Sequence, residues 1–315
     1  MTMTNYPNGI MSAGMPFGMM GVGNVYNVVD GDEAFYNDFH RNRRTTYSDG
    51  SVNLHKTIAS ALAATVECRN DYVVVWPKNS DHDITAALAM DKKAVHLVCP
   101  SGMGYDMGSN NSCRIEQTTS STSVFTITDA AVEIAGFYLK PYTGVATISG
   151  TAGCYAANVH HNYFVLRGSV SSGASILTTT TAFAWGSIMR NKFENQVSSA
   201  TYGSIVTIQP AATGTEVSYN HVSVGNQSTA TIGIENSAVL GNTNFNVFSE
   251  CGTSSTANGG TITACVSIHE SSCAIGNRCA VASGGFSAGG TAGSSFCDNL
   301  DGRTTSGTDV WNLES

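Results

Sequence analysis

Three glutamates come closest, by type and spacing, to an enzyme's active site. A glycosidase cleaves its substrate with two carboxylates that lie roughly 5–10 Å apart. The spacing between Glu194, Glu216 and Glu235 is close to the length of the repeats described below, so stacked repeats could bring two of them together. Counted from the nearest repeated asparagine, however, they lie at +3, −4 and −7. They are therefore out of register, and we expect surface glutamates, with a glycosidase pair as the alternative.

Histidines and cysteines offer three places where a metal could bind. His160 and His161 are adjacent, and neighbouring strand residues point to opposite faces, so this pair is not expected to share an ion. His82 lies between Asp81 and Asp83 and gives a weak cation site in a loop. The third set is Cys265, His269, Cys273 and Cys279. Residues four apart in a strand are roughly 13 Å apart, so we expect buried thiols and no metal or other cofactor.

Two further patterns have both a functional and a structural interpretation. Residues 285–289 read Gly-Phe-Ser-Ala-Gly and match the GxSxG pattern of hydrolases. That motif needs a helix after the serine and a later histidine, but the last histidine, His269, precedes it, so we expect a loop. Several aromatic residues could stack on sugars, although core packing is the commoner explanation: Tyr155, Tyr163, Phe183, Trp185, Tyr202 and Tyr219.

An asparagine recurs within one short motif, in which apolar residues stand three positions before it and two after it. The motif is complete at Asn162, Asn191 and Asn220, recurs at Asn242 with Phe245 as the following apolar residue, and is weaker at Asn277 and Asn299. They are separated by 29, 29, 22, 35 and 22 residues, and Gly136 takes the same position in an earlier copy. Repeats of this length are typical of solenoids. We predict that the asparagines stack as a buried ladder and adopt the left-handed backbone that a corner needs.

The composition indicates short strands and excludes several classes of function. Only 12% of the 315 residues are charged, and small and β-branched residues dominate, as in chains of repeated strands and tight turns. From residue 112 onward, short apolar runs alternate with turn residues. The net charge of −8 argues against a nucleic-acid partner. No apolar run is long enough to span a membrane. We therefore predict an all-β chain that forms a single-stranded right-handed parallel β-helix.

One helix is expected, and it divides the chain into segments. Apolar residues recur at helical spacing from Ser51 to Cys68, with Leu54, Ile58 and Leu62 on one stripe. An open β-helix end needs a cover, so we expect this helix to cap the first coil. The predicted segments are a docking arm at 1–28, a first strand, loop and capping helix at 29–70, the β-helix at 71–300 and a tail at 301–315.

The N-terminal segment 1–28 does not fit a folded domain. It is rich in Met and Gly, contains no Lys or Arg and shows no periodicity, so a signal peptide is not expected. Exposed apolar segments are a liability unless a partner covers them, and Met adapts to irregular grooves. We expect an arm that docks on a partner through Tyr6, Pro7, Ile10, Met15, Phe17, Met19 and Met20.

The strand residues Val25 to Val28, the capping helix, the run from Asp71 to Pro77 and the asparagine-marked coils resemble the pectate-lyase-like right-handed parallel β-helix superfamily. The opening Tyr-Pro-Asn-Gly-Ile at residues 6–10 is similar to the start of a group of virion-associated proteins of tailed bacteriophages that share this body. The resemblance implies a homotrimeric head decoration protein, short fibre or spike. Lyase chemistry needs clustered aspartates, and Asp298 and Asp301 fall where the repeats end, so lyase activity is not expected.

Two functions follow as expectations. The first is a non-enzymatic structural protein of a virion, a capsid decoration protein or short head fibre, made in the host cytoplasm and bound to the major capsid protein or another virion protein through its arm. The alternative is a tailspike-like depolymerase that cleaves a host surface polysaccharide, or a module that binds such a glycan without cleaving it. In the alternative, Glu194, Glu216 and Glu235 supply the catalytic carboxylates.

Overall fold

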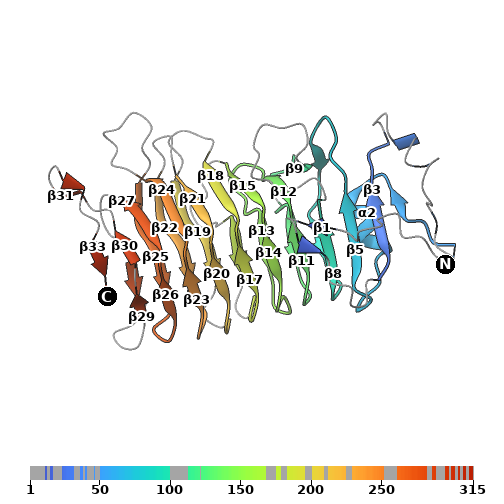
Figure 1. Cartoon of the computed structure of the whole chain (residues 1–315). Coiled ribbons are helices and arrows are strands. Elements are labelled where there is room, and N and C mark those ends of the chain that lie inside the picture. Colours follow the sequence, from blue (N-terminus) through green and yellow to red (C-terminus); the bar gives the residue numbers. More distant parts are fainter. Residues whose placement is uncertain are drawn as a thin grey trace.

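The computed structural model shows an elongated body, with the first strands of the sheets at one end and the last strands at the other (Figure 1). The residues that it describes are 11–12, 15–16, 23–31, 36–37, 40, 46, 50–99, 113–120, 122–167, 175–178, 183–195, 201–208, 212–224, 229–251, 261–281, 286–288, 295–297, 299–301, 304–305, 308–309 and 312–314. No helix in these ranges is long and apolar enough to cross a membrane.

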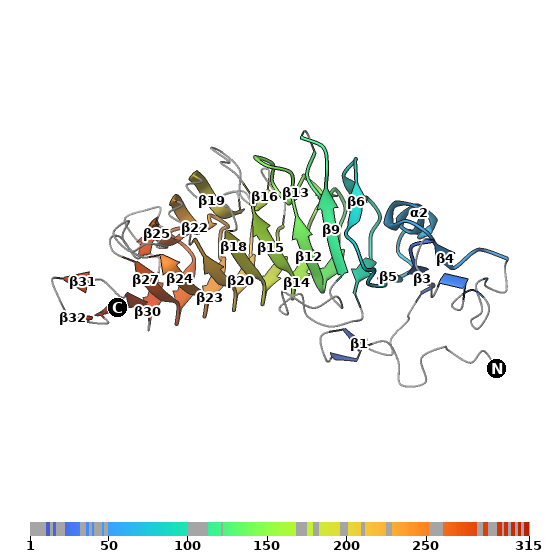
Figure 2. The same cartoon turned by 90° about the horizontal axis from the view of Figure 1, so that it is seen from above.

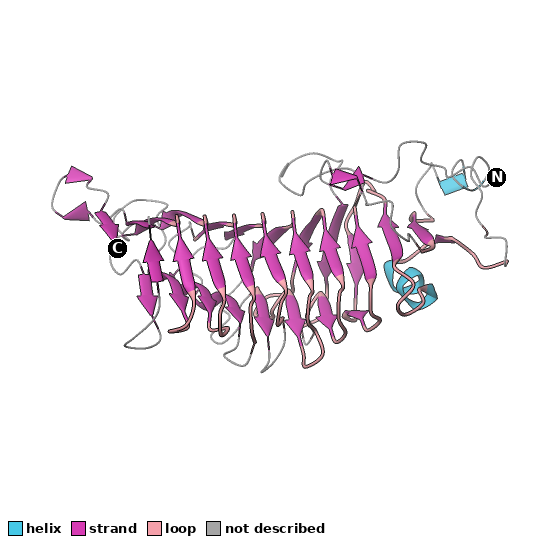
Figure 3. Ribbon diagram, turned by 60° about the horizontal axis from the view of Figure 1, so that its bottom comes forward, coloured by secondary structure: helices cyan, strands magenta, loops and turns pink. Residues whose placement is uncertain are grey.

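The chain forms a right-handed parallel β-helix, as its sequence predicts. Each complete coil gives one strand to each of three parallel sheets, so a strand pairs with the strands three before and three after it. Figure 3 shows the resulting row of aligned arrows. Adjacent coils are therefore about 4.8 Å apart along the axis.

The three sheets contain eight, eleven and ten strands. The eight-stranded sheet consists of β7 (Leu88–Met90), β10 (Phe125–Ile127), β13 (Ile148–Gly150), β16 (Ile176–Thr178), β19 (Thr201–Ile208), β22 (Thr229–Asn236), β25 (Thr261–Ile268) and β28 (Phe286–Ala288). The eleven-stranded sheet consists of β4 (Leu54–His55), β3 (Val25–Val28), β5 (Asp71–Val75), β8 (Val95–Val98), β11 (Glu133–Ala135), β14 (Asn158–His160), β17 (Ser187–Met189), β20 (Glu216–Ser218), β23 (Asn242–Asn244), β26 (Cys273–Ile275) and β29 (Ser295–Cys297).

The ten-stranded sheet consists of β6 (His82–Ile84), β9 (Cys113–Gln117), β12 (Phe137–Lys140), β15 (Tyr163–Leu166), β18 (Lys192–Asn195), β21 (His221–Ser223), β24 (Val247–Cys251), β27 (Arg278–Val281), β30 (Asn299–Asp301) and β33 (Asn312–Glu314). Two hairpins lie outside these sheets, β1 (Met11–Ser12) with β2 (Met15–Pro16) and β31 (Thr304–Thr305) with β32 (Thr308–Asp309).

One continuous hydrophobic core fills the β-helix from Tyr26 to Cys279. Its side chains form rows along the axis, because residues in register on successive strands point the same way. Ile134, Val159, Ile188 and Val217 form one such row, and all are fully buried. Burying one such side chain stabilises the fold by up to about 1.5–3 kcal/mol.

A ladder of buried asparagines runs along the corner between the eleven- and ten-stranded sheets. In each step, the backbone N–H and the Nδ2 of one asparagine both donate to the Oδ1 of the asparagine one coil further on. Each Nδ2 also donates to a carbonyl of the preceding coil, as from Asn191 to Val159 at 2.9 Å. The members of the ladder are Asn162, Asn191, Asn220, Asn246, Asn277 and Asn299.

The prediction for Asn242 was therefore wrong, and Asn246 takes its place. Asn242 lies in β23 with its side chain exposed, whereas Asn246 is fully buried and accepts from the backbone N–H of Asn220 at 2.9 Å. Asparagine stands at residues 242, 244 and 246, and none of them has the full motif: Asn242 follows the apolar Val239 by three positions, whereas Asn246 precedes the apolar Phe248 by two. With Asn246 in the ladder, the spacing along the sequence between successive members becomes more even than the motif alone indicated.

From Asn162 to Asn277, the left-handed backbone at this corner belongs to the residue before each ladder asparagine, not to the asparagine as predicted. These residues have φ from 54° to 88° and are Gly136, His161, Arg190, Tyr219, Phe245 and Gly276. Gly136 thus precedes the ladder position, which Phe137 occupies, and the Phe137 N–H donates to Asn162 Oδ1. A Cβ on Gly136 would lie 3.0 Å from the Cys99 carbonyl oxygen, so glycine suits this coil.

The capping helix is shorter than predicted. Helix α2 (Ile58–Ala64) begins after Thr57, whose Oγ1 accepts from the Ser60 N–H. Ile58 and Leu62 are buried in the main core, and α2 covers its N-terminal end (Figure 2). Leu54 is buried but lies in β4, where it pairs with β3 and packs against Val29, so its assignment to the helix was wrong.

The boundary of the N-terminal arm also changes. Strand β3 pairs with β5 along its length, and the backbone N–H groups of Gly23 and Asn24 bond to Asn70 and Asp71. Residues 23–28 therefore belong to the β-helix and not to the arm, which was predicted at 1–28. At the other end, β33 pairs antiparallel with β30, so residues of the predicted tail extend the ten-stranded sheet.

Candidate functional site

The three candidate carboxylates lie on three different sheets. Glu194 is in β18 of the ten-stranded sheet, Glu216 in β20 of the eleven-stranded sheet and Glu235 in β22 of the eight-stranded sheet. Their inward-pointing neighbours, such as Phe193, Val217 and Ile234, fill the core that separates these faces. The structure thus brings no two of the three together, in agreement with their mismatched register.

The surroundings of these glutamates differ. Glu194 accepts from Lys192 at 2.7 Å and from the Tyr163 hydroxyl. Burial alone would raise the pKa of Glu194, but these two bonds outweigh it and lower the pKa, whereas a general acid needs a raised one. Glu235 accepts from Ser204 Oγ at 2.8 Å. Glu216 has no ion-pair partner among the residues that the structure describes.

A charged cluster on the ten-stranded sheet contains a different pair of carboxylates, Asp81 and Glu116. Lys140 Nζ bonds to both, while Arg114 pairs with Asp81 and Arg167 with Glu116, each at 2.7 Å. Although burial opposes it, hydrogen bonding with Glu116 and Lys140 and the positive charges of Lys140 and Arg114 lower the pKa of Asp81. Because three cations neutralise these two acids, the cluster is suited to linking neighbouring coils and not to proton donation.

A chain of hydrogen-bonded side chains crosses three coils on the outer face of the eleven-stranded sheet. Its centre is Glu133, whose Oε2 lies 2.7 Å from His96 Nδ1 and whose Oε1 lies 2.7 Å from His160 Nε2. The chain continues from His96 to Asn70 Oδ1 at 2.6 Å and from His160 Nδ1 to His161 Nδ1 at 2.8 Å. The Tyr72 ring stacks on His96 with centroids 4.3 Å apart. We call these residues the His–Glu chain.

The electrostatics of the His–Glu chain favour an ionised carboxylate. Burial raises the pKa of Glu133, but its bonds to His160 and His96 and their charges outweigh burial and lower the pKa to about 2. Burial, together with the charges of His160 and Arg190, lowers the pKa of His161 to about 4. At neutral pH, Glu133 is thus an anion held between two imidazoles, and His161 is neutral.

His160 and His161 lie closer together than predicted. His161 is at the corner with φ 54°, so its side chain does not follow strand alternation, and its ring meets that of His160 edge to face. The two rings hydrogen-bond to each other, and among the described residues no three Cys, His, Asp or Glu side chains converge as a metal site.

His82 and the cysteines also fall outside any such cluster. The buried His82 ring bonds through Nε2 to the Trp76 carbonyl at 3.2 Å, while Asp81 belongs to the charged cluster. Cys265 and Cys279 are core residues, and Cys273 bonds to Asn242 Oδ1 at 2.8 Å. Seven cysteines are free thiols, namely Cys68, Cys99, Cys113, Cys154, Cys265, Cys273 and Cys279.

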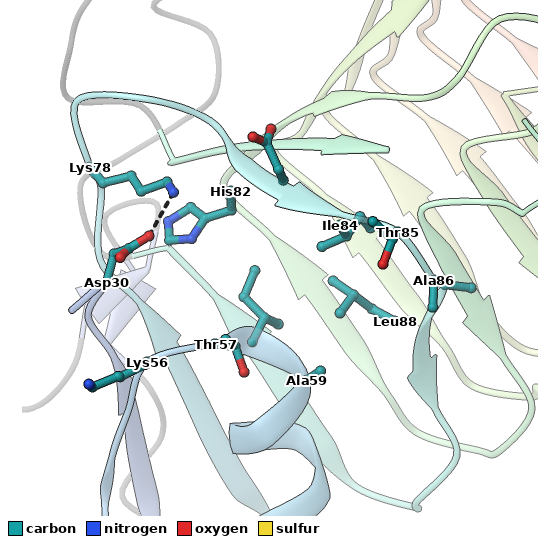
Figure 4. Close-up of a pocket in the computed structure, with 13 residues that line it drawn as sticks. Asp30, Lys56, Thr57, Ala59, Lys78, His82, Ile84, Thr85, Ala86 and Leu88 are labelled. Atoms are coloured by element: carbon teal, nitrogen blue, oxygen red, sulfur yellow. Dashed lines mark hydrogen bonds and ion pairs between the residues drawn. The ribbon is translucent and has the colours of Figure 1, made fainter. Parts of the chain in front are cut away.

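A pocket of about 280 Å³ lies between α2 and the first complete coil (Figure 4). Thr57 and Lys56 line it on the side of α2, and an ion pair of 2.7 Å between Lys78 and Asp30 closes its other side. Burial, partly opposed by the Trp76 carbonyl, lowers the pKa of His82, which keeps this ring neutral. Lys78 and Asp30 thus pair with each other, and the other charged residues that line the pocket, Lys56 and Asp83, are exposed to solvent.

The aromatic residues divide into two groups. Tyr163 and Phe183 are fully buried, whereas Tyr155, Trp185 and Tyr219 are 49%, 68% and 49% exposed at the corners that border the eleven-stranded sheet. At one corner, the rings of Tyr219 and Phe245 stack at 5.1 Å, with the Arg190 guanidinium over Tyr219.

Other predicted site residues lie largely outside the described part of the chain. Residues 286–288 of the GxSxG segment form strand β28, so the prediction of a loop was wrong for these residues, and the two outer glycines are not described. Of the predicted docking residues, Met15 lies in β2, while Tyr6, Pro7, Ile10, Phe17, Met19 and Met20 fall outside the described residues.

Comparisons of the chain with protein-family models, with curated proteins and with solved structures found no match. The interpretation of function therefore depends on the fold and on the surfaces described above.

The His–Glu chain was not predicted from the sequence. Its members His96, Glu133 and His160 lie on three successive strands of one sheet and are far apart along the sequence. The available signal covered only His96 and Glu133, which stand at the same distance before Cys99 and Gly136, two equivalent positions, whereas His160 stands directly before its corner residue His161. Recognising it requires the strand register, which the sequence alone did not supply.

Proposed function

We propose that this chain is a non-enzymatic structural protein of a bacteriophage virion, a capsid decoration protein or short head fibre. In this proposal the β-helix is a rigid shaft, and residues 1–22 attach its α2 end to the major capsid protein or another virion protein. The support for the shaft is the uninterrupted asparagine ladder from Asn162 to Asn299 together with one continuous core. The support for a virion location is the resemblance of the first residues to phage proteins.

The location of the candidate carboxylates is the observation that most favours a structural role over catalysis. Hydrolysis of a glycosidic bond needs two carboxylates within about 10 Å. Glu194, Glu216 and Glu235 lie on separate sheets, and Asp81 and Glu116 are neutralised by three cations. The alternative, a host polysaccharide depolymerase, would need a pair of acids that these residues do not form.

Deletion of residues 1–22 tests attachment. The cut leaves Gly23 and Asn24, whose backbone bonds hold β3 in place, so the shortened chain should keep the circular dichroism and unfolding transition of the full chain. We expect the full chain to co-sediment with virus particles assembled without it, and the shortened chain to remain in the supernatant. A chain cut after residue 10 serves as the intermediate comparison.

Two outcomes would oppose the proposal. Equal co-sedimentation of the full and shortened chains would show that residues 1–22 are not the anchor. Release of new reducing ends from host capsule by the full chain would favour the depolymerase. Sedimentation velocity of the purified full chain tests the homotrimer that belongs to the same proposal.

A further inference from the structure

An exposed tryptophan lies at the corner between the eight- and eleven-stranded sheets. Trp185 is 68% exposed, which is the largest value among the exposed large hydrophobic residues in the described part of the chain. Its ring lies against Gly214 of the next coil, where an added Cβ would be 2.4 Å from Cε3. Because Gly214 has no side chain, the indole can lie against the backbone there while most of the Trp185 surface stays exposed.

A row of polar side chains runs beside this indole. Ser187, Glu216 and Asn242 are in register on β17, β20 and β23, so they are about 4.8 Å apart along the axis. Their inward neighbours Ile188, Val217 and Thr243 are fully buried, so strand alternation points all three outward. Each lies two residues after a corner residue, Ser187 after Trp185 and Asn242 after the exposed Leu240.

The side chains of this row have hydrogen-bonding groups that are available to a ligand. The Glu216 carboxylate has no hydrogen bond or ion pair among the described residues. Asn242 accepts from Cys273 through Oδ1, which leaves its two Nδ2 hydrogens as donors. Ser187 Oγ donates to Asn158 Oδ1 and can still accept. A ligand at this row thus meets a donor, an acceptor and an anionic acceptor beside a flat apolar face.

We propose that Trp185, Ser187, Glu216 and Asn242 form a binding site, the indole site, for a neutral pyranose of a polysaccharide. A pyranose has an apolar face of C–H groups that can stack on the exposed indole and a rim of hydroxyls that fits the donors and acceptors of the row. Glu216 and the net charge of −8 disfavour acidic sugars. The row follows the helix axis, so successive sugars of one chain would lie along it.

The indole site differs from a hydrolase site in having one carboxylate. Glu216 is on a different sheet from Glu194 and Glu235, so the site binds the glycan and leaves it intact. The coils beneath it are held by the asparagine ladder through Asn191, Asn220 and Asn246. The site is therefore formed before the ligand arrives, which lowers the entropic cost of binding.

Affinity electrophoresis in gels that contain dextran, yeast mannan or galactomannan, with hyaluronate as the acidic comparison, tests this inference. We expect at least one neutral polymer to retard the full chain and hyaluronate not to do so. Trp185→Ala should weaken retardation by about tenfold or more, and Trp185→Phe should retain part of it. Glu216→Ala should also weaken it. Tyr219→Ala, which removes an exposed aromatic at the opposite edge of the same sheet, is the matched control and should leave it unchanged.

Several results would contradict the indole site. Absence of retardation by all three neutral polymers, or equal weakening by Trp185→Ala and Tyr219→Ala, would overturn the indole site. If Trp185→Ala instead converts an oligomer to monomers in sedimentation velocity, the indole contacts a second copy of the chain, which also overturns it. Because Trp185 is exposed, its variants should unfold at the same temperature as the parent chain. The inference does not depend on residues 1–22, so its failure is separate from failure of virion attachment.

Discussion

The asparagine ladder makes a sharp prediction at residues 242 and 246, where two asparagines four positions apart have opposite environments. The Asn246 Oδ1 accepts from the Asn220 backbone N–H at 2.9 Å, and its Nδ2 donates to the Val217 carbonyl at 2.9 Å. Asn246→Ala removes both bonds and also the two ladder bonds between side chains, from Asn220 Nδ2 to Asn246 Oδ1 and from Asn246 Nδ2 to Asn277 Oδ1, each at 3.0 Å. In this variant, Asn220 Nδ2 still donates to the Ile188 carbonyl, and the backbone N–H of residue 246 still donates to Asn277 Oδ1. Two buried backbone groups therefore lose a partner.

The expected cost follows from these two groups. A buried group left without its hydrogen bond costs about 1–3 kcal/mol, so Asn246→Ala should lower the free energy of unfolding by about 2–6 kcal/mol. Asn242→Ala removes an exposed side chain and should change it by less than about 0.5 kcal/mol. The pair shares residue type, substitution and coil, so the difference reports the ladder alone.

Urea unfolding followed by circular dichroism measures the difference, and hydrogen exchange locates it. Each coil of a solenoid contacts mainly its neighbours, so faster exchange in Asn246→Ala should concentrate in peptides covering residues 217–224 and 242–251. If Asn242→Ala destabilises the chain as much as Asn246→Ala, or neither does, the ladder does not have the stabilising role inferred from its hydrogen bonds.

Two further predictions concern the N-terminal cap and the His–Glu chain. Leu62→Ala should lower the free energy of unfolding by about 2–5 kcal/mol, because Leu62 is buried where α2 closes the core; the exposed Ala63→Ser should leave it unchanged, and equal transitions for both would argue against a closing role. The pKa of Glu133 is about 2 against an ordinary 4.5, so its contribution of about 3 kcal/mol is present above pH 4.5 and lost as the pH falls toward 2. The His161 pKa of about 4 adds a loss between pH 6.5 and 4, because the unfolded chain binds that proton first. Urea unfolding across this range should show both losses, and Glu133→Gln should remove the lower one; an unchanged slope in Glu133→Gln would refute the assignment.

The repeat was predictable because the asparagine and its apolar neighbours are local signals. Asn162, Asn191 and Asn220 each carry the motif within a short window of sequence, and their spacing alone indicates a solenoid. The corner was predicted one residue too late, because His161, Arg190 and Tyr219 adopt positive φ without being glycine or asparagine. Residue type therefore gave no turn signal at these three positions.

The extent of the helix and the surface sites also depend on contacts between residues that are far apart in the sequence. Leu54 fits the helical periodicity, but its pairing with Asn27 in β3 overrides that local preference. The mismatch of the three glutamates could be predicted, since it needs only distance from the repeated asparagine. The His–Glu chain and the indole site could not, because they depend on which residues share a register across coils whose loops differ in length.

Cryo-electron microscopy of particles that contain this protein tests virion attachment most directly. The eleven-stranded sheet has ten intervals of about 4.8 Å, so the shaft should appear as a rod about 48 Å long. If the chain is an anchored shaft, this rod projects from the particle with the α2 end at the particle surface. A rod attached by its opposite end, or particles with no density for the protein, would contradict attachment through residues 1–22.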